Sequence, residues 1–314
     1  MNAVEKDKMA KGIASALVSG AEKEGIDYRV YFSKVVLQAK QEDRERLLGV
    51  SDEVRNRLCA EYTEERKHYK GVKFKLEPEM SFILIFFFYR FYPTQELLSL
   101  LFPISRTSVN RLLPHLNDLL YIKLKHLVDM ESAEERKKDH RMILAHIVTG
   151  IVDGTEQESM KPSTITLQAL YYSVKKAQHS FTKVAGVSAS GKILLLSRSF
   201  PGSINDSAIM DSLMPTLETA LADWECWIGD KGFRKVHPRI LAPTSNESLA
   251  REFSSVRIKV ENVFASMKQY AICRDTLRIA ISSESDSAKA LELHHKYYTI
   301  VAALVNLKSH NSKY

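Results

Sequence analysis

Cysteine is scarce in this chain of 314 residues, which contains three cysteines and no Cys-x-x-Cys pair. Cys59, Cys226 and Cys273 lie far apart, so we expect neither a zinc finger nor a disulfide framework. Scattered cysteines of this kind are typical of free thiols in a reducing compartment.

Long hydrophobic runs are also missing. The longest, Phe82 to Phe88, is too short to cross a bilayer. The first residues, Met1 to Lys8, are charged and lack the apolar core of a signal peptide. We therefore expect an intracellular, soluble protein with no membrane partner.

The chain has enough apolar residues to fold and carries an excess of positive charge. Its hydrophobic content of 45% can bury a sizeable core, and its length allows two domains or one large domain with an appendage. The net charge of +7 favours a polyanionic partner, although a solvated basic surface would give the same count.

The stretch from Arg257 to Lys268 has the periodicity of a helix. One stripe of apolar residues recurs at helical spacing: Val256, Val260, Val263 and Met267. Arg257, Glu261 and Lys268 are four and then seven positions apart, which places them on a common line roughly 100° from the stripe. A carboxylate between two cations suits a site at the end of a sheet, but ordinary i,i+4 pairs on an exposed helix fit the same spacing.

Two short apolar runs each end in an aspartate near a glycine. Ile151 and Val152 precede Asp153, and the run from Cys226 to Ile228 precedes Asp230. This pattern predicts two buried strands whose last residues carry carboxylates at their carboxyl ends. Asp next to Gly is also turn chemistry, so each aspartate taken alone is equally a strand-end turn residue.

The order of these features resembles the DDE transposases. A strand with Asp153, a strand with Asp230 and a helix with Arg257, Glu261 and Lys268 are similar to the bacterial insertion-sequence enzymes and the PIF/Harbinger group with its nuclease-like relatives. Two further matching pieces are residues 171–179 and 201–206, and the resemblance covers roughly residues 85 to 305. Ser254 stands where the family has a tyrosine, and Asn205 where a histidine is usual.

The resemblance implies an α/β, RNase H-like catalytic domain that cleaves DNA phosphodiesters with Mg²⁺ or Mn²⁺. It implies that Asp153, Asp230 and Glu261 are the metal ligands, because these ions prefer carboxylate oxygens. Lys268 would neutralise a DNA phosphate, and Arg257 would do the same or hold Glu261. Asp206 is the less favoured alternative for the middle carboxylate, since it is expected to be the N-cap of a helix running to Leu221.

A helix-turn-helix is predicted ahead of this domain. Thr94 is expected to cap a helix from Gln95 to Leu101, and Ser105 a second helix from Arg106 to about Leu113. Arg106, Asn110 and Arg111 on the second helix suit phosphates and base edges. A helical hairpin inside an all-α bundle is the alternative.

The remaining pattern gives the outline of the chain. Residues 1–75 are expected to be helical, with a solvated charge run at 63–68 and core positions at Val30, Phe32, Val35 and Val36. Residues 118–139 are expected to stay helical and to end in a hydrophilic linker at 134–139. Strands are predicted at 147–153, 167–172, 181–188, 192–200 and 224–228, with a glycine hairpin at 189–191, and helices at 206–221, 247–270 and 288–307.

These predictions define three regions: a helical part at 1–75, a DNA-binding part at 76–140 and a catalytic part at 141–314. The resemblance implies a transposase that cleaves double-stranded DNA at terminal inverted repeats, performs strand transfer and acts as a homodimer. It would act in the nucleus of a eukaryote or the cytoplasm and nucleoid of a bacterium. The alternatives are a domesticated, inactive DNA-binding descendant and a helical interaction protein with no nucleic acid. The role of residues 1–75 stays open between dimer contact, DNA contact and packing.

Overall fold

The computed structural model describes residues 12, 15, 16, 18–68, 75–143, 145–234, 236–243 and 247–310, without the side chains of 247–252 and 310. The chain divides into two compact units, one ending at Leu119 and the other beginning at Leu120. The helical expectation for residues 1–11 and 69–74 lies outside the described residues.

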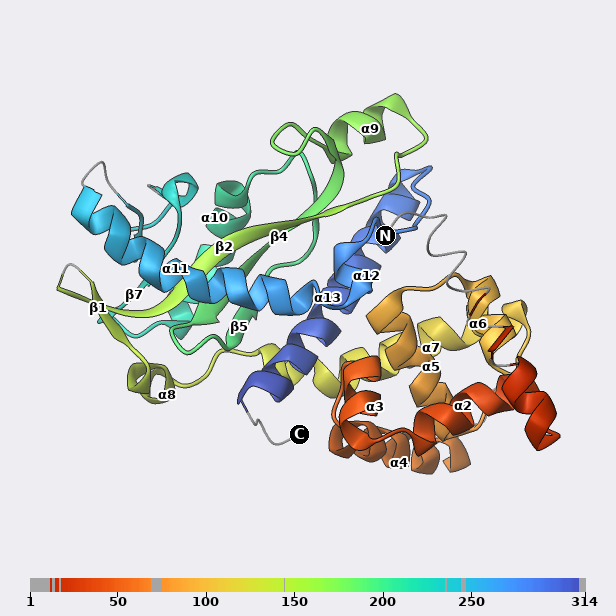
Figure 1. Cartoon of the computed structure of the whole chain (residues 1–314). Helices are drawn as coiled ribbons and strands as arrows, with labels where there is room; N and C mark the ends of the chain where they lie inside the picture. The colour runs from red at the N-terminus through yellow and green to blue at the C-terminus, as the bar shows by residue number, and fades with distance from the viewer. Residues whose placement is uncertain are drawn as a thin grey trace. The chain divides into compact units, whose positions relative to one another are not determined.

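The first unit is helical (Figure 1). Its elements are α2 (Tyr28–Gln38), α3 (Gln41–Leu48), α4 (Asp52–His68), α5 (Pro78–Phe91), α6 (Gln95–Leu101) and most of α7 (Arg106–Leu124).

The elements of the second unit follow in chain order: η1 (Lys125–Val128), α8 (Ala133–Lys138), β1 (Arg141–Ile143), β2 (His146–Glu158), α9 (Ile165–Tyr171), β3 (Tyr172–Ser173), β4 (Gln178–Ser188), β5 (Ile193–Leu196), β6 (Phe200–Pro201), α10 (Asp206–Ala220), β7 (Glu225–Ile228), η2 (Lys231–Phe233), β8 (Ile240–Leu241), α11 (Glu247–Met267), α12 (Ala271–Arg274) and α13 (Glu284–His310).

Helix α5 is the centre of the first unit. It begins at Pro78, where a missing backbone N–H costs nothing, and it is buried from Ser81 to Tyr89. Phe32 of α2 packs edge-on against Phe87, with ring centroids 5.3 Å apart. Val36 is buried as predicted, but the expected core position Val35 is 41% exposed.

Helix α7 runs 11 residues beyond the predicted end at Leu113, to Leu124. Pro114 lies inside it and removes one backbone hydrogen bond, a change that often ends a helix. The helix continues because a buried stripe runs along its whole length: Val109, Leu112, Leu113, Leu116, Leu120 and Leu124. Burial of this stripe outweighs the loss of the hydrogen bond.

The second unit is built on a mixed sheet that, within the described residues, has eight strands. The neighbours along its main path are β3, β4, β2, β7 and β8, while β5 and β6 pair with β4, and β1 with β2. Strands β2 and β4 are antiparallel, whereas β7 runs parallel to β2 and β8 parallel to β7. The expected α/β class, a helical region followed by an RNase H-like domain, is confirmed.

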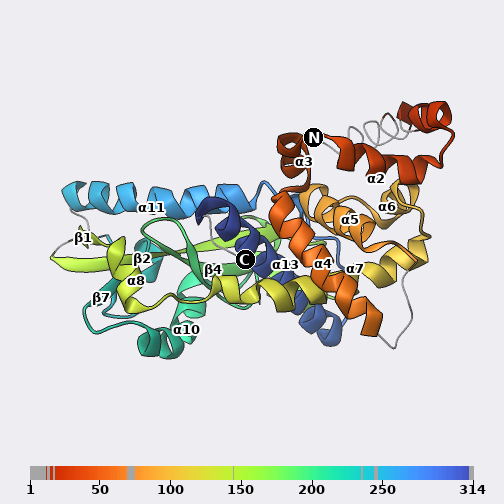
Figure 2. The ribbon, with the colours of Figure 1, turned by 90° about the horizontal axis from the view of Figure 1, so that it is seen from below.

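The two faces of this sheet are covered by different helices. In Figure 2, α11 and α10 lie on opposite sides of the strands. Val152 of β2 belongs to a buried cluster with Ile209 and Met210 of α10. Its neighbour Asp153 points the opposite way and contacts Arg257 of α11. Successive side chains of β2 therefore alternate between the face of the sheet covered by α10 and the face covered by α11.

Two glycines make room for the largest core side chain. A Cβ on Gly150 would lie 2.4 Å from the ring of Trp227, and one on Gly186 would lie 2.3 Å from it. Trp227, on β7, is fully buried and lies flat across β2 and β4. Any larger residue at either position would push β7 away from the sheet.

Several strand predictions are wrong in their limits. Residues 167–171 lie in α9, and only Tyr172 lies in a strand, β3. The segment is helical because Thr164 caps it and Leu167 and Tyr171, one turn apart, are buried. The predicted strand at 192–200 is divided into β5 and β6, and β8 and α12 had no prediction. The glycine hairpin is confirmed: Gly191 has φ 101° and joins β4 to β5.

The expected hydrophilic linker at 134–139 lies mostly in α8, and its residues are exposed except for Arg136. The Arg136 side chain is 1% exposed, and its Nε donates to Glu225 Oε1 at 2.7 Å. Thr149 Oγ1 and the backbone N–H of Ala222 also donate to Glu225. This buried ion pair ties α8 to β7 across 89 positions of sequence.

No helix in the described part of the chain has the length and apolar composition needed to cross a membrane.

Candidate active site and DNA-binding helices

Asp153 lies on β2, and Asp230 follows the neighbouring parallel strand β7, which ends at Ile228. Ile151 of β2 pairs with Ile228 of β7, and each aspartate comes two residues later in the sequence. The observed pairing stops at Ile151 and Ile228, and Asp230 is already the N-cap of η2. The joint role of the two carboxylates stays a prediction.

Asp153 is not the last residue of its strand, as the sequence suggested. Strand β2 continues to Glu158 because its antiparallel partner β4 pairs with it as far as Glu158 opposite Ser180. The pairing with β7 ends at Ile151, so Asp153 lies where the sheet opens on that side. Asp230 does behave as a turn residue: its Oδ1 accepts from the backbone N–H of Gly232 at 2.8 Å.

Arg257 reaches Asp153 from α11. Its Nη2 donates to Asp153 Oδ2 at 3.0 Å, and the two side chains are 27% and 17% exposed. The Nε of Arg257 is buried with no hydrogen-bond partner among the described residues. Asp153 Oδ1 accepts from the N–H of Gly154. Half-burial on both sides makes this contact stronger than an exposed surface pair.

Glu261 and Lys268 are both exposed, Glu261 one helical turn after Arg257 and Lys268 just beyond the end of α11. The last turn continues through Lys268, whose N–H donates to Phe264 O, so the predicted common line holds. Val260, Val263 and Met267 are buried. The apolar stripe on the signature helix is therefore confirmed.

Within the described residues, no group of three or more His, Cys, Asp and Glu side chains is close enough to hold an ion. The donor type does fit Mg²⁺ or Mn²⁺, because Asp153 and Asp230 carry carboxylate oxygens, which these ions prefer. Arg257 already places a cation against Asp153, so this position accepts positive charge.

Asp206 lies on the other side of β2 from Asp153. A Cβ on Gly154 would be 2.2 Å from the Asp206 carboxylate carbon, on the face that carries α10. The predicted N-cap role is wrong: Asn205 is the cap, accepting from the N–H of Ala208 at 2.8 Å, and Asp206 is the first residue of α10. Asn205, which stands where the family usually has a histidine, is thus the N-cap of α10.

The Asp206 carboxyl is the most perturbed acid near this edge. Burial raises its pKa, and the nearby charges of Asp153, Glu156 and Asp230 raise it further, while Lys175 lowers it. Lys175 Nζ lies 3.7 Å from Asp206 Oδ2. The charges of these three acids therefore all disfavour ionisation of Asp206. Sequence reasoning missed Glu156, although strand alternation would have placed it on the Asp206 face.

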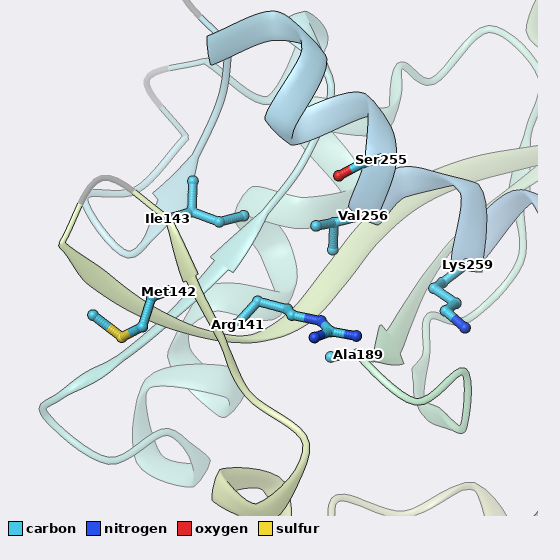
Figure 3. A pocket seen from close by; sticks show the side chains of 7 residues that line it. All are labelled: Arg141, Met142, Ile143, Ala189, Ser255, Val256 and Lys259. Atoms are coloured by element: carbon cyan, nitrogen blue, oxygen red, sulfur yellow. The ribbon is translucent and has the colours of Figure 1, made fainter. Parts of the chain in front are cut away.

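A cavity of about 300 Å³ opens beside the first half of α11 (Figure 3). Its lining combines apolar and cationic side chains: Arg141, Met142, Ile143, Ala189, Ser255, Val256 and Lys259. Arg141 and Lys259 are both exposed. The cavity holds no carboxylate, so it is separate from the aspartate pair.

The predicted helix-turn-helix has the expected caps. Thr94 Oγ1 accepts from the N–H of Leu97 at 3.1 Å, and Ser105 Oγ from the N–H of Ser108 at 3.2 Å. Arg106, Asn110 and Arg111 are exposed on the first two turns of α7. Asn110 Oδ1 accepts from Gln95 Nε2 of α6 at 3.2 Å, which fixes one base-reading candidate against the first helix.

Comparison with known proteins supports both the α/β domain and the helix-turn-helix. A family model described as DDE superfamily endonuclease matches residues 152–306, and its partner, the helix-turn-helix of DDE superfamily endonuclease, matches residues 74–126. The chain belongs to the DDE superfamily endonucleases. No curated protein and no solved structure matches it.

Membership of this family confirms the predicted DDE transposase type. The DDE model begins one residue before Asp153 and includes Asp230 and Glu261. The helix-turn-helix model includes α5, α6 and α7. The helical hairpin reading of residues 93–115 is thereby replaced by a helix-turn-helix. The roles of individual residues stay predictions.

Proposed function

We propose that this DDE superfamily endonuclease cleaves DNA phosphodiester bonds with Mg²⁺ or Mn²⁺ and transfers the resulting strand ends. Asp153, Asp230 and Glu261 are the proposed metal ligands and catalytic residues. The observation that carries the proposal is that Asp153 on β2 and Asp230, two residues after the end of β7, belong to two neighbouring parallel strand segments paired at Ile151 and Ile228. Metal ions bound there would supply an activated water and a stabilised leaving oxygen.

The neighbouring cations have distinct proposed roles. Arg257 holds Asp153 in place, a contact that the sequence analysis did not expect, since it gave Arg257 a DNA phosphate or Glu261 as its partner. Lys268, exposed at the end of α11, binds a phosphate of the substrate strand. Glu261 is exposed one turn from Arg257, and the proposal requires its side chain to turn toward the aspartates when metal binds.

DNA binding is assigned to α7. Arg106 and Arg111 are proposed to contact phosphates or guanine, and Asn110 adenine. The proposed targets are inverted repeats at the ends of a mobile element, bound by a homodimer. Light scattering of the purified chain with and without such a duplex would test the dimer, and a monomer in both states would contradict it.

The decisive experiment replaces Glu261 by Gln and measures nicking of supercoiled plasmid in Mg²⁺ or Mn²⁺. The carboxylate loses its charge but keeps its shape, so cleavage should be abolished while DNA binding stays nearly intact. Glu292→Gln is the matched control, because Glu292 is an exposed carboxylate on α13 with a 66% exposed side chain. A Glu261→Gln variant that nicks as fast as the parent would show that the triad is wrong.

Asp230 and Asp206 are separated by a second pair of variants. Asp230→Asn should eliminate nicking without lowering the melting temperature in metal-free buffer. Asp206→Asn should retain measurable nicking, because Asp206 lies across β2 from Asp153 and is not a helix cap. The reverse pattern would move the middle carboxylate to Asp206.

A DNA-binding descendant without cleavage is the second candidate. The observation that favours it is that Arg257 is paired with Asp153 while Glu261 is exposed and no three-carboxylate group is closed among the described residues. In that case DNA binding would persist, while the parent and the Glu261→Gln variant would both fail to nick plasmid in either metal.

A further inference from the structure

The hairpin between β3 and β4 presents an apolar side chain at its tip. Val174 is 87% exposed. Below it, Tyr172 pairs with His179 and Ser173 with Gln178. The rings of Tyr172 and His179 lie 5.6 Å apart, and Ser173 Oγ accepts from the N–H of Lys176. The tip is therefore held by its own hydrogen bonds, with a valine in solvent.

Two lysines follow this valine. Lys175 and Lys176 are both exposed, and there is no acidic residue from Tyr172 to His179. Lys175 Nζ lies 3.7 Å from Asp206 Oδ2, which places the tip beside the first residue of α10. The Lys175 side chain is 69% exposed, so this ion pair is weak and easily exchanged for another anion.

We propose that residues 174–176 form a wedge that enters DNA beside Asp206. Val174 inserts against the bases, and Lys175 and Lys176 bind the flanking phosphates. Apolar side chains flanked by cations unstack a base step in this way in proteins that distort the duplex. The inference rests on the proposed function for its ligand, double-stranded DNA, and adds which segment distorts it.

The alternative partner for this hairpin is a second copy of the chain, since β3 is the last strand on its side of the sheet's main path. Two copies of this hairpin in symmetric contact would bring four lysines together with no acidic residue between Tyr172 and His179 to offset them. Like charges this close destabilise a pairing. The charge pattern therefore favours DNA.

The test measures how far the chain unwinds a closed plasmid, and any plasmid sequence can be used. The full chain is mixed with relaxed, closed plasmid in EDTA and a topoisomerase that works without metal, and the topoisomers are separated after protein removal. An inserted side chain unwinds the duplex and changes the linking number. The parent should produce this change, and Val174→Ser should reduce it at least by half while binding to a labelled duplex stays within about threefold, a loss below 1 kcal/mol.

Ile165→Ser is the matched control, because Ile165 is 85% exposed on α9 but lies outside the hairpin; it should behave as the parent. Replacing Lys175 and Lys176 by Gln should lower the salt dependence of DNA binding by about two phosphate contacts, whereas Lys161→Gln, tested separately, should leave it within the range of the parent.

Equal topoisomer shifts in the parent and Val174→Ser, or no shift in the parent, would overturn the wedge. A Val174→Ser variant that changes only the oligomeric state would assign the tip to a second copy instead. Plasmid nicking is measured separately in Mg²⁺. A chain that unwinds but does not nick would remove the proposed cleavage and leave the wedge in place.

Discussion

Removing Arg136 should destabilise the second unit more than any surface change. Arg136 and Glu225 form a buried ion pair with side chains 1% and 0% exposed. Arg136→Met keeps the apolar length of the side chain but leaves the Glu225 charge without its cation. Breaking a buried pair from one side costs about 3–5 kcal/mol, because the remaining charge is desolvated and unpaired.

The double variant Arg136→Met/Glu225→Met supplies the critical comparison. With both charges removed, the desolvation cost disappears, so most of the lost unfolding free energy should return. Lys138→Met is the surface control, because Lys138 and its ion-pair partner Glu135 are 65% and 55% exposed. This substitution should change the free energy of unfolding by no more than about 0.5 kcal/mol.

The assay is urea unfolding followed by tryptophan fluorescence. The chain has two tryptophans, Trp224 and Trp227, and they flank Glu225. For a urea dependence of about 2 kcal/mol per M, the midpoint of Arg136→Met should fall by roughly 2 M.

The pH dependence gives a second check. Burial raises the pKa of the Glu225 carboxyl, but hydrogen bonds from Arg136, the Ala222 N–H and Thr149 outweigh it and hold the pKa below 4.5. The stability that Glu225 contributes is therefore present above 4.5 and is lost as the pH falls through the lower, folded-state pKa. The loss in Arg136→Met should shrink in acid. A double variant as unstable as the single one would refute this reasoning.

Three further predictions concern other sites. Burial and neighbouring charges raise the pKa of Asp206, so its ionisation lowers the free energy of unfolding as the pH rises through that pKa. Asp206→Asn should remove this pH dependence of the melting temperature in metal-free buffer. Burial lowers the pKa of His295 from 6.5 to about 4, so stability should fall as the pH drops through this range, and His295→Gln should flatten the change in urea midpoint. Arg106→Gln and Arg111→Gln should each reduce the salt slope of DNA binding by about one phosphate contact, measured by fluorescence anisotropy; an unchanged slope would contradict the assignment of α7.

The local pattern was sufficient wherever a segment decides its own structure. The caps at Thr94 and Ser105, the turn at Gly191 and the apolar stripe of α11 all depend on neighbours within a few residues, and all are present. The order of the two aspartates and the signature helix also needed only the sequence. The fold class followed from the family resemblance.

The errors arise where distant segments decide. The helix was predicted to end at about Leu113, but burial of Leu116, Leu120 and Leu124 extends it past Pro114. Asp153 was given as a strand end because Gly154 follows, but pairing with β4 extends β2 to Glu158. In both cases long-range packing outweighs a local breaker.

The sequence by itself determined the family, the class of fold and the candidate residues Asp153, Asp230 and Glu261, because motif order and periodicity are local properties. The tertiary structure alone decided that Arg257 pairs with Asp153, that Asp206 lies across β2 and that Arg136 is buried against Glu225. These contacts join residues 104, 52 and 89 positions apart. Only the sheet register and the packing of helices on its two faces bring such residues together, so no pattern within one segment could have predicted them.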